Sequence, residues 1–266
     1  MSVAPFTRRR LAVTGMDELG AYRVLRVADP DAPEPDPGQF AMLAAAERWG
    51  GGDEERPYLP RAFSIARRVG AESHFLLEDV GPGSRRLCEL QAGERVWLLG
   101  PLGRGFRLPP ARRRSLLVGG GAGIAPLAIL QDGLAGEVVV LLGFRDAARA
   151  QGAGLLDGAR VATDDGSAGH HGPVTDLLAA ELERDPLALV YACGPAPMLE
   201  AVRAMCAERS VPAQLALEAP MACGFGGCFG CTVARRGGGY LRVCVDGPVI
   251  DAEQLEHVDP HAGAPA

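Results

Sequence analysis

Four cysteines near the C-terminal end constrain this chain more than any other feature. They follow the pattern C-x4-C-x2-C-x12-C, a spacing used to hold a [2Fe-2S] cluster, whose plant-type form also opens C-x4-C-x2-C. Three ligands then come from one loop that wraps the cluster, and the fourth comes from a neighbouring strand. Glycine in such a loop permits positive φ and brings backbone N–H groups near the sulfurs. The cysteines are Cys223, Cys228, Cys231 and Cys244, and the glycines are Gly224, Gly226, Gly227 and Gly230.

Two other uses of the four thiols stay open at this point. Structural zinc sites usually carry two C-x2–4-C pairs, and this segment has one C-x2-C. Disulfides need an oxidising compartment, and we expect none because no secretory segment is recognisable ahead of the thiols. The spacing therefore favours the cluster over zinc and over disulfides.

Length and charge limit the other classes of function. The chain has 266 residues, which suggests one to two domains plus a small appendage. With 27 basic against 33 acidic residues its net charge is −6, so we expect neither nucleic acid nor a membrane as a partner. No apolar run reaches the length of a membrane span, and the expected location is cytoplasmic. No G-x-S-x-G, H-E-x-x-H or P-loop pattern supports hydrolysis or phosphoryl transfer.

Residues 1–110 have a strand-like pattern. Short apolar runs alternate with Pro- and Gly-rich turns, which predicts an antiparallel β-barrel or sandwich. A helix is expected over 84–90, where Cys88 falls in an apolar context and is predicted to be a small buried side chain. The expected strands lie at 22–27, 39–43, 62–65, 74–77 and 95–99.

The pattern changes at Ser115, where strands begin to alternate with helices. This alternation predicts a doubly wound parallel sheet over 111–217, with Cys206 buried in a helix. The segment 218–266 then forms a small C-terminal block that carries the four cysteines. The expected strands are 116–118, 137–144, 160–163, 187–191 and 214–217, and the expected helices are 124–134, 175–183 and 197–208.

Two fragments of the predicted barrel have the residue types of a phosphate and ring-binding site. Arg61-Ala-Phe-Ser64 lies on a strand edge, and Gly81-Pro-Gly-Ser84 opens the helix about twenty residues later. An arginine adds a bidentate cation for phosphate, and glycines before a helix leave N–H groups free. Phe63 offers a flat ring surface. Taken alone, either fragment fits an ordinary strand and turn equally well.

The predicted parallel sheet carries a glycine-rich loop. The run Gly119-Gly-Gly-Ala-Gly-Ile-Ala-Pro126 follows a strand and precedes a helix, which is the context of a dinucleotide-binding loop, although it is not the strict G-x-G-x-x-G. Its alternate glycines permit close approach of the backbone to a pyrophosphate or a nicotinamide. Pro126 suits the first helical turn.

A second signal is Tyr191-Ala-Cys-Gly-Pro-Ala-Pro-Met198, at the carboxyl end of another strand. Ligands of open α/β sheets bind at that edge, so Cys193 is expected to face the cleft in an electron-transfer or nicotinamide-packing role. The alternative is a small residue in a tight turn, since no partner base is visible. Arg145 or Arg149 offers a cation for a 2′-phosphate, but Asp146 makes that signal mixed.

Taken in order, these four motifs resemble those of the flavin and iron–sulfur electron-transfer subunits of the NAD-dependent dihydroorotate dehydrogenases, within the ferredoxin-reductase superfamily. The resemblance covers nearly the whole chain and includes Pro37-Gly-Gln-Phe40, Gly100-Pro-Leu-Gly-Arg-Gly-Phe106 and Met221-Ala-Cys-Gly224. The cysteine pattern, with Glu218 before it, is its specific part. The chain departs from the usual pattern at Ala62, where proline is usual, at Ser84, where threonine is common, and at Arg104, where asparagine is common.

The resemblance implies two sets of cofactor-binding residues. FAD would be held by Arg61, Ala62, Phe63, Ser64, Leu77, Glu78, Asp79, Gly83 and Ser84. NADH would dock across Gly119, Gly120, Gly121, Gly123, Ile124, Cys193, Gly194, Pro195 and Met198.

The function that follows is electron transfer. NADH would reduce FAD, and electrons would pass through the [2Fe-2S] cluster to an FMN-containing dihydroorotate dehydrogenase catalytic subunit of pyrimidine biosynthesis, in a heterotetramer of two of each chain. The alternative keeps the cofactors but places the chain in a transhydrogenase, sulfite reductase or oxygenase system. An alternative of another class is a non-catalytic iron–sulfur or zinc scaffold without a working nicotinamide site.

Overall fold

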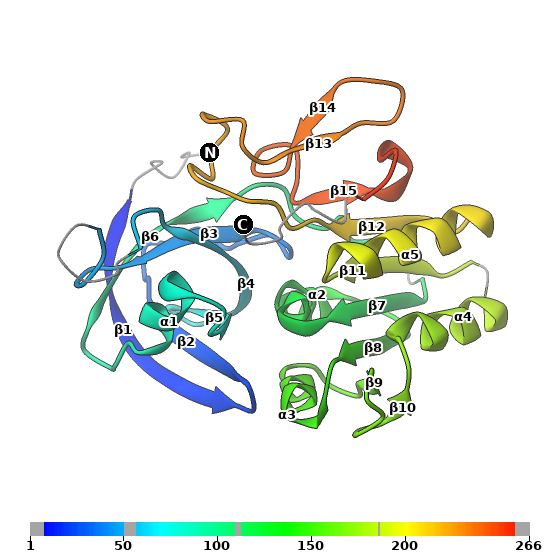
Figure 1. The fold of residues 1–266 in the computed structure, drawn as a ribbon, viewed down its shortest axis with the longest axis horizontal. Coiled ribbons are helices and arrows are strands. Elements are labelled where there is room, and N and C mark those ends of the chain that lie inside the picture. The colour runs from blue at the N-terminus through cyan, green and yellow to red at the C-terminus, as the bar shows by residue number, and fades with distance from the viewer. Residues whose placement is uncertain (1–7, 51–56, 110–112, 186, 259–266) are drawn as a thin grey trace.

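The computed structural model describes residues 8–50, 57–109, 113–185 and 187–258. It has a β-barrel on one side and a helix-covered sheet on the other, with the cysteine segment lying along one edge of both (Figure 1). None of the helices in the described ranges is long and apolar enough to cross a membrane.

The first part is a closed antiparallel barrel with strand order β1-β2-β5-β4-β3-β6. Alternation along its strands sends apolar side chains such as Leu25, Phe75 and Leu77 into a shared interior. The predicted antiparallel barrel is confirmed. Its strands are β1 (Arg9–Leu19), β2 (Tyr22–Ala28), β3 (Phe40–Ala45), β4 (Arg61–Val69), β5 (Glu72–Glu78) and β6 (Arg95–Leu102).

Helix α1 (Pro82–Cys88) closes one end of this barrel. Proline stands in its first turn, where the missing N–H costs nothing, which explains why the helix begins two residues before the expected Ser84. Leu87 and Leu90 are fully buried against the barrel interior. The helix therefore fixes the loop that follows β5.

The second part is a seven-stranded sheet with order β10-β9-β8-β7-β11-β12-β15. Six strands run parallel, and β7 and β11 are buried along their whole length, as expected for strands covered by helices on both faces. The predicted parallel sheet is confirmed. Its strands are β7 (Ser115–Gly120), β8 (Val138–Phe144), β9 (Arg160–Thr163), β10 (His170–His171), β11 (Leu189–Cys193), β12 (Ala213–Ala216) and β15 (Val249–Asp251).

Helical segments connect these strands. The glycine loop forms the 3-10 turn η1 (Gly121–Ile124) before α2 (Ala125–Gly133), so the regular helix begins one residue after the expected position. The others are α3 (Ala147–Ala150), η2 (Gln151–Leu155), α4 (Val174–Arg184) and α5 (Ala196–Glu208).

Barrel and sheet share an apolar contact. One buried cluster contains Tyr22 and Leu76 from the barrel with Leu127 and Leu130 from α2. Arg67 of β4 adds a polar contact at the same boundary, because it donates to both carboxylate oxygens of Asp132 at 2.9 and 2.8 Å. The two parts are thus joined by core packing and by an ion pair.

The C-terminal segment is tied to the sheet. A hairpin of β13 (Thr232–Ala234) and β14 (Tyr240–Arg242) precedes β15, which pairs antiparallel with β12 from Ala216↔Val249 to Gln214↔Asp251. After β15 come η3 (Ala252–Gln254) and the buried Leu255. The predicted boundary between 217 and 218 thus lies between two neighbouring strands of one sheet.

Candidate functional site

The four cysteines lie in the loop and hairpin between β12 and β15. Cys231 and Cys244 are buried, and their Sγ atoms are 3.2 Å apart. Cys223 is half-buried and Cys228 is exposed, and the two thiols lie close enough to influence each other. The structure thus brings the four predicted metal ligands into one region as two pairs.

Two glycines allow the cysteine loop to pack closely against the barrel and against its own second half. Gly224 and Gly226 have φ of 78° and 87°, a region that favours glycine. A Cβ at Gly224 would lie 2.5 Å from the Cγ of Met42, and one at Gly226 would lie 2.7 Å from a methyl carbon of Val245. Larger residues would therefore push the loop away from the barrel and from its own second half.

The electrostatics of the thiols differ within the site. Desolvation acts to raise the pKa of Cys223, but hydrogen bonds from the backbone of Phe225 and Cys228 outweigh it and lower that pKa to about 6. Burial raises the pKa of Cys244 to about 12, and its neighbour Cys231 contributes to the rise. Cys223 therefore becomes a thiolate more readily than Cys244.

The chemistry of the donor set fits an iron–sulfur cluster. Within the described ranges, no group of three or more His, Cys, Asp or Glu side chains is placed to hold one metal ion, so the four thiols lie near one another without forming a single-ion site. Two thiol pairs suit a cluster of two irons, since four thiolates bind a [2Fe-2S] unit. Backbone N–H groups that already point at Cys223 would also stabilise the charge of a bound cluster.

Aromatic side chains surround the cysteine loop at the surface. Phe225, Phe229 and Tyr240 are 50%, 60% and 76% exposed. The guanidinium of Arg242 lies 5.2 Å from the ring centroid of Phe229. Exposed aromatic groups beside a cationic side chain are typical of a protein-binding surface.

The barrel residues expected to bind flavin occupy β4, the end of β5 and the start of α1. Arg61 crosses directly over Gly83, where a Cβ would lie 2.6 Å from the arginine Nε. Ser84 is buried, and its hydroxyl accepts a hydrogen bond from the N–H of Val80 and donates to the carbonyl of Gly81. Arg61 and the α1 turn thus converge, as the sequence predicts, and Ser84 holds the turn in shape.

The other residues predicted to bind flavin differ in how far they are exposed to solvent. Phe63 and Ser64 are half-buried on β4, while Ala62 is exposed. Leu77 is fully buried inside the barrel, so a ligand can reach this position only through main-chain atoms. Glu78 faces the sheet instead, which alternation along β5 explains.

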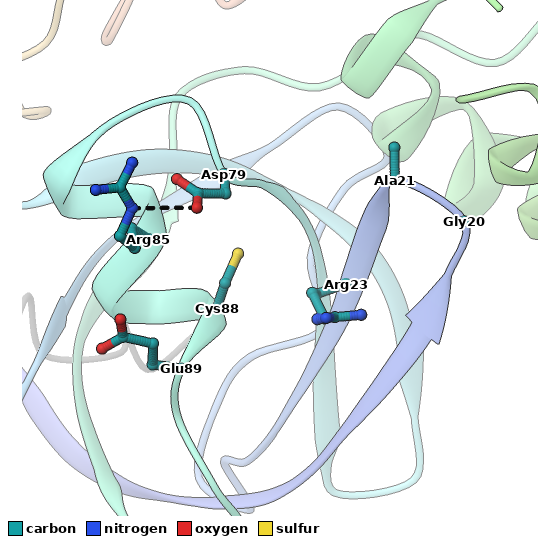
Figure 2. A pocket seen from close by; sticks show the side chains of 7 residues that line it. All are labelled: Gly20, Ala21, Arg23, Asp79, Arg85, Cys88 and Glu89. Carbon is teal, nitrogen blue, oxygen red and sulfur yellow. Dashed lines mark hydrogen bonds and ion pairs between the residues drawn. The ribbon is translucent and has the colours of Figure 1, made fainter. Parts of the chain in front are cut away.

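A cavity of about 340 Å³ adjoins Asp79, between α1 and the turn that joins β1 to β2 (Figure 2). The Cys88 thiol lines it, so the prediction that Cys88 is a buried core residue was wrong: this side chain is half-buried. Burial, then the charge of Asp79, raises the pKa of Cys88 to about 11. The remaining lining residues are Gly20, Ala21, Arg23, Arg85 and Glu89.

In the sheet, the two glycine-containing segments meet. A Cβ at Gly123 would lie 2.6 Å from the backbone of Gly194, and one at Gly120 would lie 2.6 Å from the sulfur of Met198. Gly121 has a φ of 55°. The segments after β7 and β11, expected from the sequence to bind a dinucleotide together, are therefore in direct contact, and Gly120, Gly123 and Gly194 have no room for side chains.

Cys193 ends β11, between Gly119 of β7 and Ala216 of β12. It is 4% exposed, and burial raises its pKa well above the ordinary value, with a further contribution from the charge of Glu218. The thiol is therefore protonated at neutral pH. Its electron-transfer or nicotinamide-packing role stays a prediction. Cys206, by contrast, is buried in α5 as expected.

The sequence names Glu218 as part of the motif before the cysteines but assigns it no role. It lies two residues after the end of β12 and is exposed to solvent, yet enough protein surrounds it for desolvation to raise its pKa. The signal that would have found it is its position two residues after the last parallel strand, at the edge where ligands of such sheets bind.

Two other side chains lie where barrel and sheet meet. Arg149 donates from Nε to Glu78 at 3.1 Å and from a terminal nitrogen to Asp146 at 2.6 Å. Tyr22 is fully buried, and its hydroxyl has no hydrogen-bond partner among the described residues. Gly121 of the dinucleotide loop is close by, because an ideal Cβ at this glycine would lie 4.0 Å from the Tyr22 hydroxyl.

Comparison with solved structures defines the class of fold. The chain is similar to an NADH-dependent reduced ferredoxin-NADP oxidoreductase, with a TM-score of 0.77 and 24% identity over 93% of this chain and 90% of that one. It is also similar to the FAD/NAD binding domain of a nitric oxide dioxygenase from Vibrio cholerae, with a TM-score of 0.63 and 20% identity over 76% and 94% of the two chains. The fold is therefore that of the ferredoxin-reductase-like proteins.

Sequence comparison gives the family within that class. Residues 218–256 match the iron-sulfur cluster binding domain of dihydroorotate dehydrogenase B. The chain is 39% identical to the dihydroorotate dehydrogenase B (NAD(+)) electron transfer subunit of Geobacillus thermodenitrificans, over 83% of this chain and 86% of that one. The identity to the subunit of Desulforamulus reducens is 36%, over 82% and 86%. The chain belongs to the family of electron transfer subunits of dihydroorotate dehydrogenase B.

Proposed function

We propose that this chain carries electrons from NADH, through FAD and a [2Fe-2S] cluster, to the FMN of a dihydroorotate dehydrogenase catalytic subunit. The observation that carries the proposal is the set of two thiol pairs on a loop that contacts the barrel through Gly224 and Met42. When bound, FAD accepts a hydride from NADH and the cluster transfers single electrons.

Protein groups for the flavin lie on one side of the barrel. Arg61 supplies a cation for a phosphate, and its side chain lies directly over the buried Gly83 at the start of α1. Phe63 and Ser64 provide a ring surface and a hydroxyl on β4. The cavity lined by Asp79 and Arg85 offers room for the adenosine end of the flavin.

Groups for the coenzyme lie at the carboxyl edge of the parallel sheet. The contact between the Gly120–Gly123 turn and Gly194 leaves main-chain atoms as the surface that a dinucleotide meets. Cys193 closes the inner end of this edge, and burial raises its pKa well above the ordinary value, so the thiol stays protonated. It therefore adds no negative charge there, which favours a neutral ring.

The aromatic rim formed by Phe225, Phe229 and Tyr240 is the docking surface that we assign to the catalytic subunit, in a heterotetramer of two of each chain. The proposed location is the cytoplasm, whose reducing conditions keep all seven cysteines available as thiols.

The test is anaerobic purification followed by titration with NADH. We expect about two irons and two acid-labile sulfides per chain, and loss of the oxidised flavin absorbance when NADH is added. Absence of iron and sulfide, or a flavin that NADH does not bleach, would contradict the proposal. Co-expression with the catalytic subunit tests the partner, because a different acceptor, as in a transhydrogenase, sulfite reductase or oxygenase system, would leave the two chains unassociated.

A further inference from the structure

The end of β8 has the position at which dinucleotide-binding sheets recognise the adenosine ribose. Asp146 follows this second parallel strand and lies 25 positions after Gly121 of the glycine loop. In such sheets a carboxylate about 20 residues after the loop accepts hydrogen bonds from the ribose hydroxyls. Asp146 is the first carboxylate after β8.

Asp146 still has the capacity to accept such hydrogen bonds. One of its carboxylate oxygens accepts from the N–H of Arg149 at 2.9 Å, and the other accepts from the Arg149 guanidinium at 2.6 Å. Each carboxylate oxygen has two lone pairs, so each can accept one more donor. The side chain is 34% exposed, which leaves it accessible to a ribose.

Arg149 is the cation that a 2′-phosphate would need at this position, but carboxylates already neutralise it. Besides Asp146 it contacts Glu78 of the barrel. These carboxylates raise the pKa of Arg149, so its charge is fixed, and the guanidinium is held between the two parts of the fold. A phosphate would have to displace at least one carboxylate to pair with it.

The neighbouring charges reinforce this arrangement. Asp165 lies close enough to Asp146 for its negative charge to oppose ionisation of that carboxyl. The hydroxyl of Ser167 donates a hydrogen bond to Asp165 and accepts one from the N–H of Ala147 at 2.7 Å. These two hydrogen bonds hold Asp165 beside the start of α3. Arg145 is exposed and forms no ion pair within the part of the chain that the structure describes. The three carboxylates near this edge thus outnumber the two arginines.

We propose that Asp146 binds the adenosine ribose of the coenzyme, and that Asp146, Asp165 and Glu78 together select NADH by repelling the 2′-phosphate of NADPH. The proposal rests on the proposed function, since it assigns a specificity to the same coenzyme site. It assigns Arg149 a positioning role: this side chain orients the carboxylate that touches the coenzyme.

Asp146→Asn is the informative variant. Asparagine is as good as aspartate at the start of a helix, so the hydrogen bond from the Arg149 N–H and the fold of α3 are retained while the charge is removed. Glu208→Gln is the matched control, because Glu208 ends α5 and is 76% exposed beside Arg209. Thermal melting and flavin content of both variants are measured first, and we expect them to equal those of the parent.

The first measurement is inhibition of NADH oxidation by 5′-AMP and by 2′,5′-ADP, which probe the ribose site without hydride transfer. The parent should bind 5′-AMP more tightly than 2′,5′-ADP. In Asp146→Asn, 5′-AMP binding should weaken by about tenfold, because a charge-assisted hydrogen bond is lost, and the preference between the two inhibitors should shrink or reverse. Glu208→Gln should match the parent.

The second measurement is kcat/KM for NADH and NADPH in the same three proteins, with a dye as acceptor. We expect the NADH to NADPH ratio to fall by about tenfold or more in Asp146→Asn alone. A parent that prefers NADPH, or a ratio and inhibitor preference unchanged by Asp146→Asn, overturns the inference while leaving electron transfer from NADH intact. A parent whose flavin neither coenzyme reduces instead overturns the proposed function.

Discussion

The Sγ atoms of Cys231 and Cys244 lie 3.2 Å apart, because the two residues lie at the two ends of the β13–β14 hairpin, Cys231 just before β13 and Cys244 two residues after β14. The N–H of Val243 donates to the carbonyl of Cys231 at 3.0 Å and holds the two segments together. This pair is buried, whereas Cys228 of the other pair is exposed. The inner half of the cluster site is therefore built into the fold, and the outer half lies at the surface.

Replacement of one outer thiol should remove the cluster without unfolding the chain. In Cys228→Ser the exposed side chain is lost as a ligand, and we expect iron and acid-labile sulfide to fall to background while flavin content and NADH-dependent flavin bleaching persist. Cys88→Ser is the matched control and should keep full iron content. Normal iron content in Cys228→Ser would show that this residue is not a ligand.

The hydroxyl of Tyr22 is buried without a partner, so its removal should not destabilise the protein. We expect Tyr22→Phe to unfold at the same denaturant concentration as the parent or at a higher one, with a gain of up to about 1 kcal/mol, because the cost of burying an unpaired hydroxyl disappears. Chemical denaturation of the apoprotein measures this. A loss of more than about 1 kcal/mol would mean that the hydroxyl is hydrogen-bonded in solution.

Glu181 is a buried carboxylate of α4 that contacts Arg114, Arg160 and Arg184. Its surface is covered by these arginines, and Arg114 is itself only 10% exposed. Glu181→Ala should therefore destabilise the chain by about 1.5–3 kcal/mol, because it removes the carboxylate that the three arginines share and leaves the buried Arg114 with Glu137 alone. Glu183→Ala on the same helix is the control and should change stability little. Equal denaturation midpoints for the two variants would contradict this account.

The same carboxylate gives a pH dependence. Desolvation acts to raise the pKa of Glu181, but hydrogen bonds from Arg114 and Arg160 outweigh it and hold the pKa below the ordinary value of 4.5. A depressed pKa contributes stability that is fully present above pH 4.5 and is lost as the pH falls through the value in the folded state. Between pH 7 and pH 3 the parent should therefore lose more stability than Glu181→Gln. Parallel pH curves for the two proteins would rule out this contribution.

Arg67 joins the barrel to the sheet through Asp132 and the carbonyl of Leu155. Arg67→Ala should destabilise the protein by about 1 kcal/mol, a modest value because solvent partly screens the pair. Arg10→Ala breaks a pair with Glu47 that is more exposed and should change the midpoint by less than about 0.5 kcal/mol. The measurement is chemical denaturation of both variants under the same conditions. A larger loss of stability in Arg10→Ala than in Arg67→Ala would show that the Arg67–Asp132 pair does not join the barrel to the sheet.

Sequence reasoning succeeded where a local pattern carries the information. The cysteine spacing, the glycine loop before α2 and the alternation of strands and helices depend on neighbours within a few residues. The pairing of β15 with β12 brings together residues more than 30 positions apart, and the Arg149 contact with Glu78 joins the two parts of the fold. Neither has a local signal. The same holds for Cys88, whose helix predicts burial but whose face opens onto a cavity formed by the β1–β2 turn.

Because β12 and β15 are adjacent strands, the cysteine loop leaves the sheet and returns to it at neighbouring points, Ala216 and Val249. A loop anchored at both ends in this way cannot swing on a tether as an appended domain would. The position of the cluster loop is therefore fixed when β15 pairs with β12. A newly made chain can form the complete cluster site only after β15 has emerged from the ribosome.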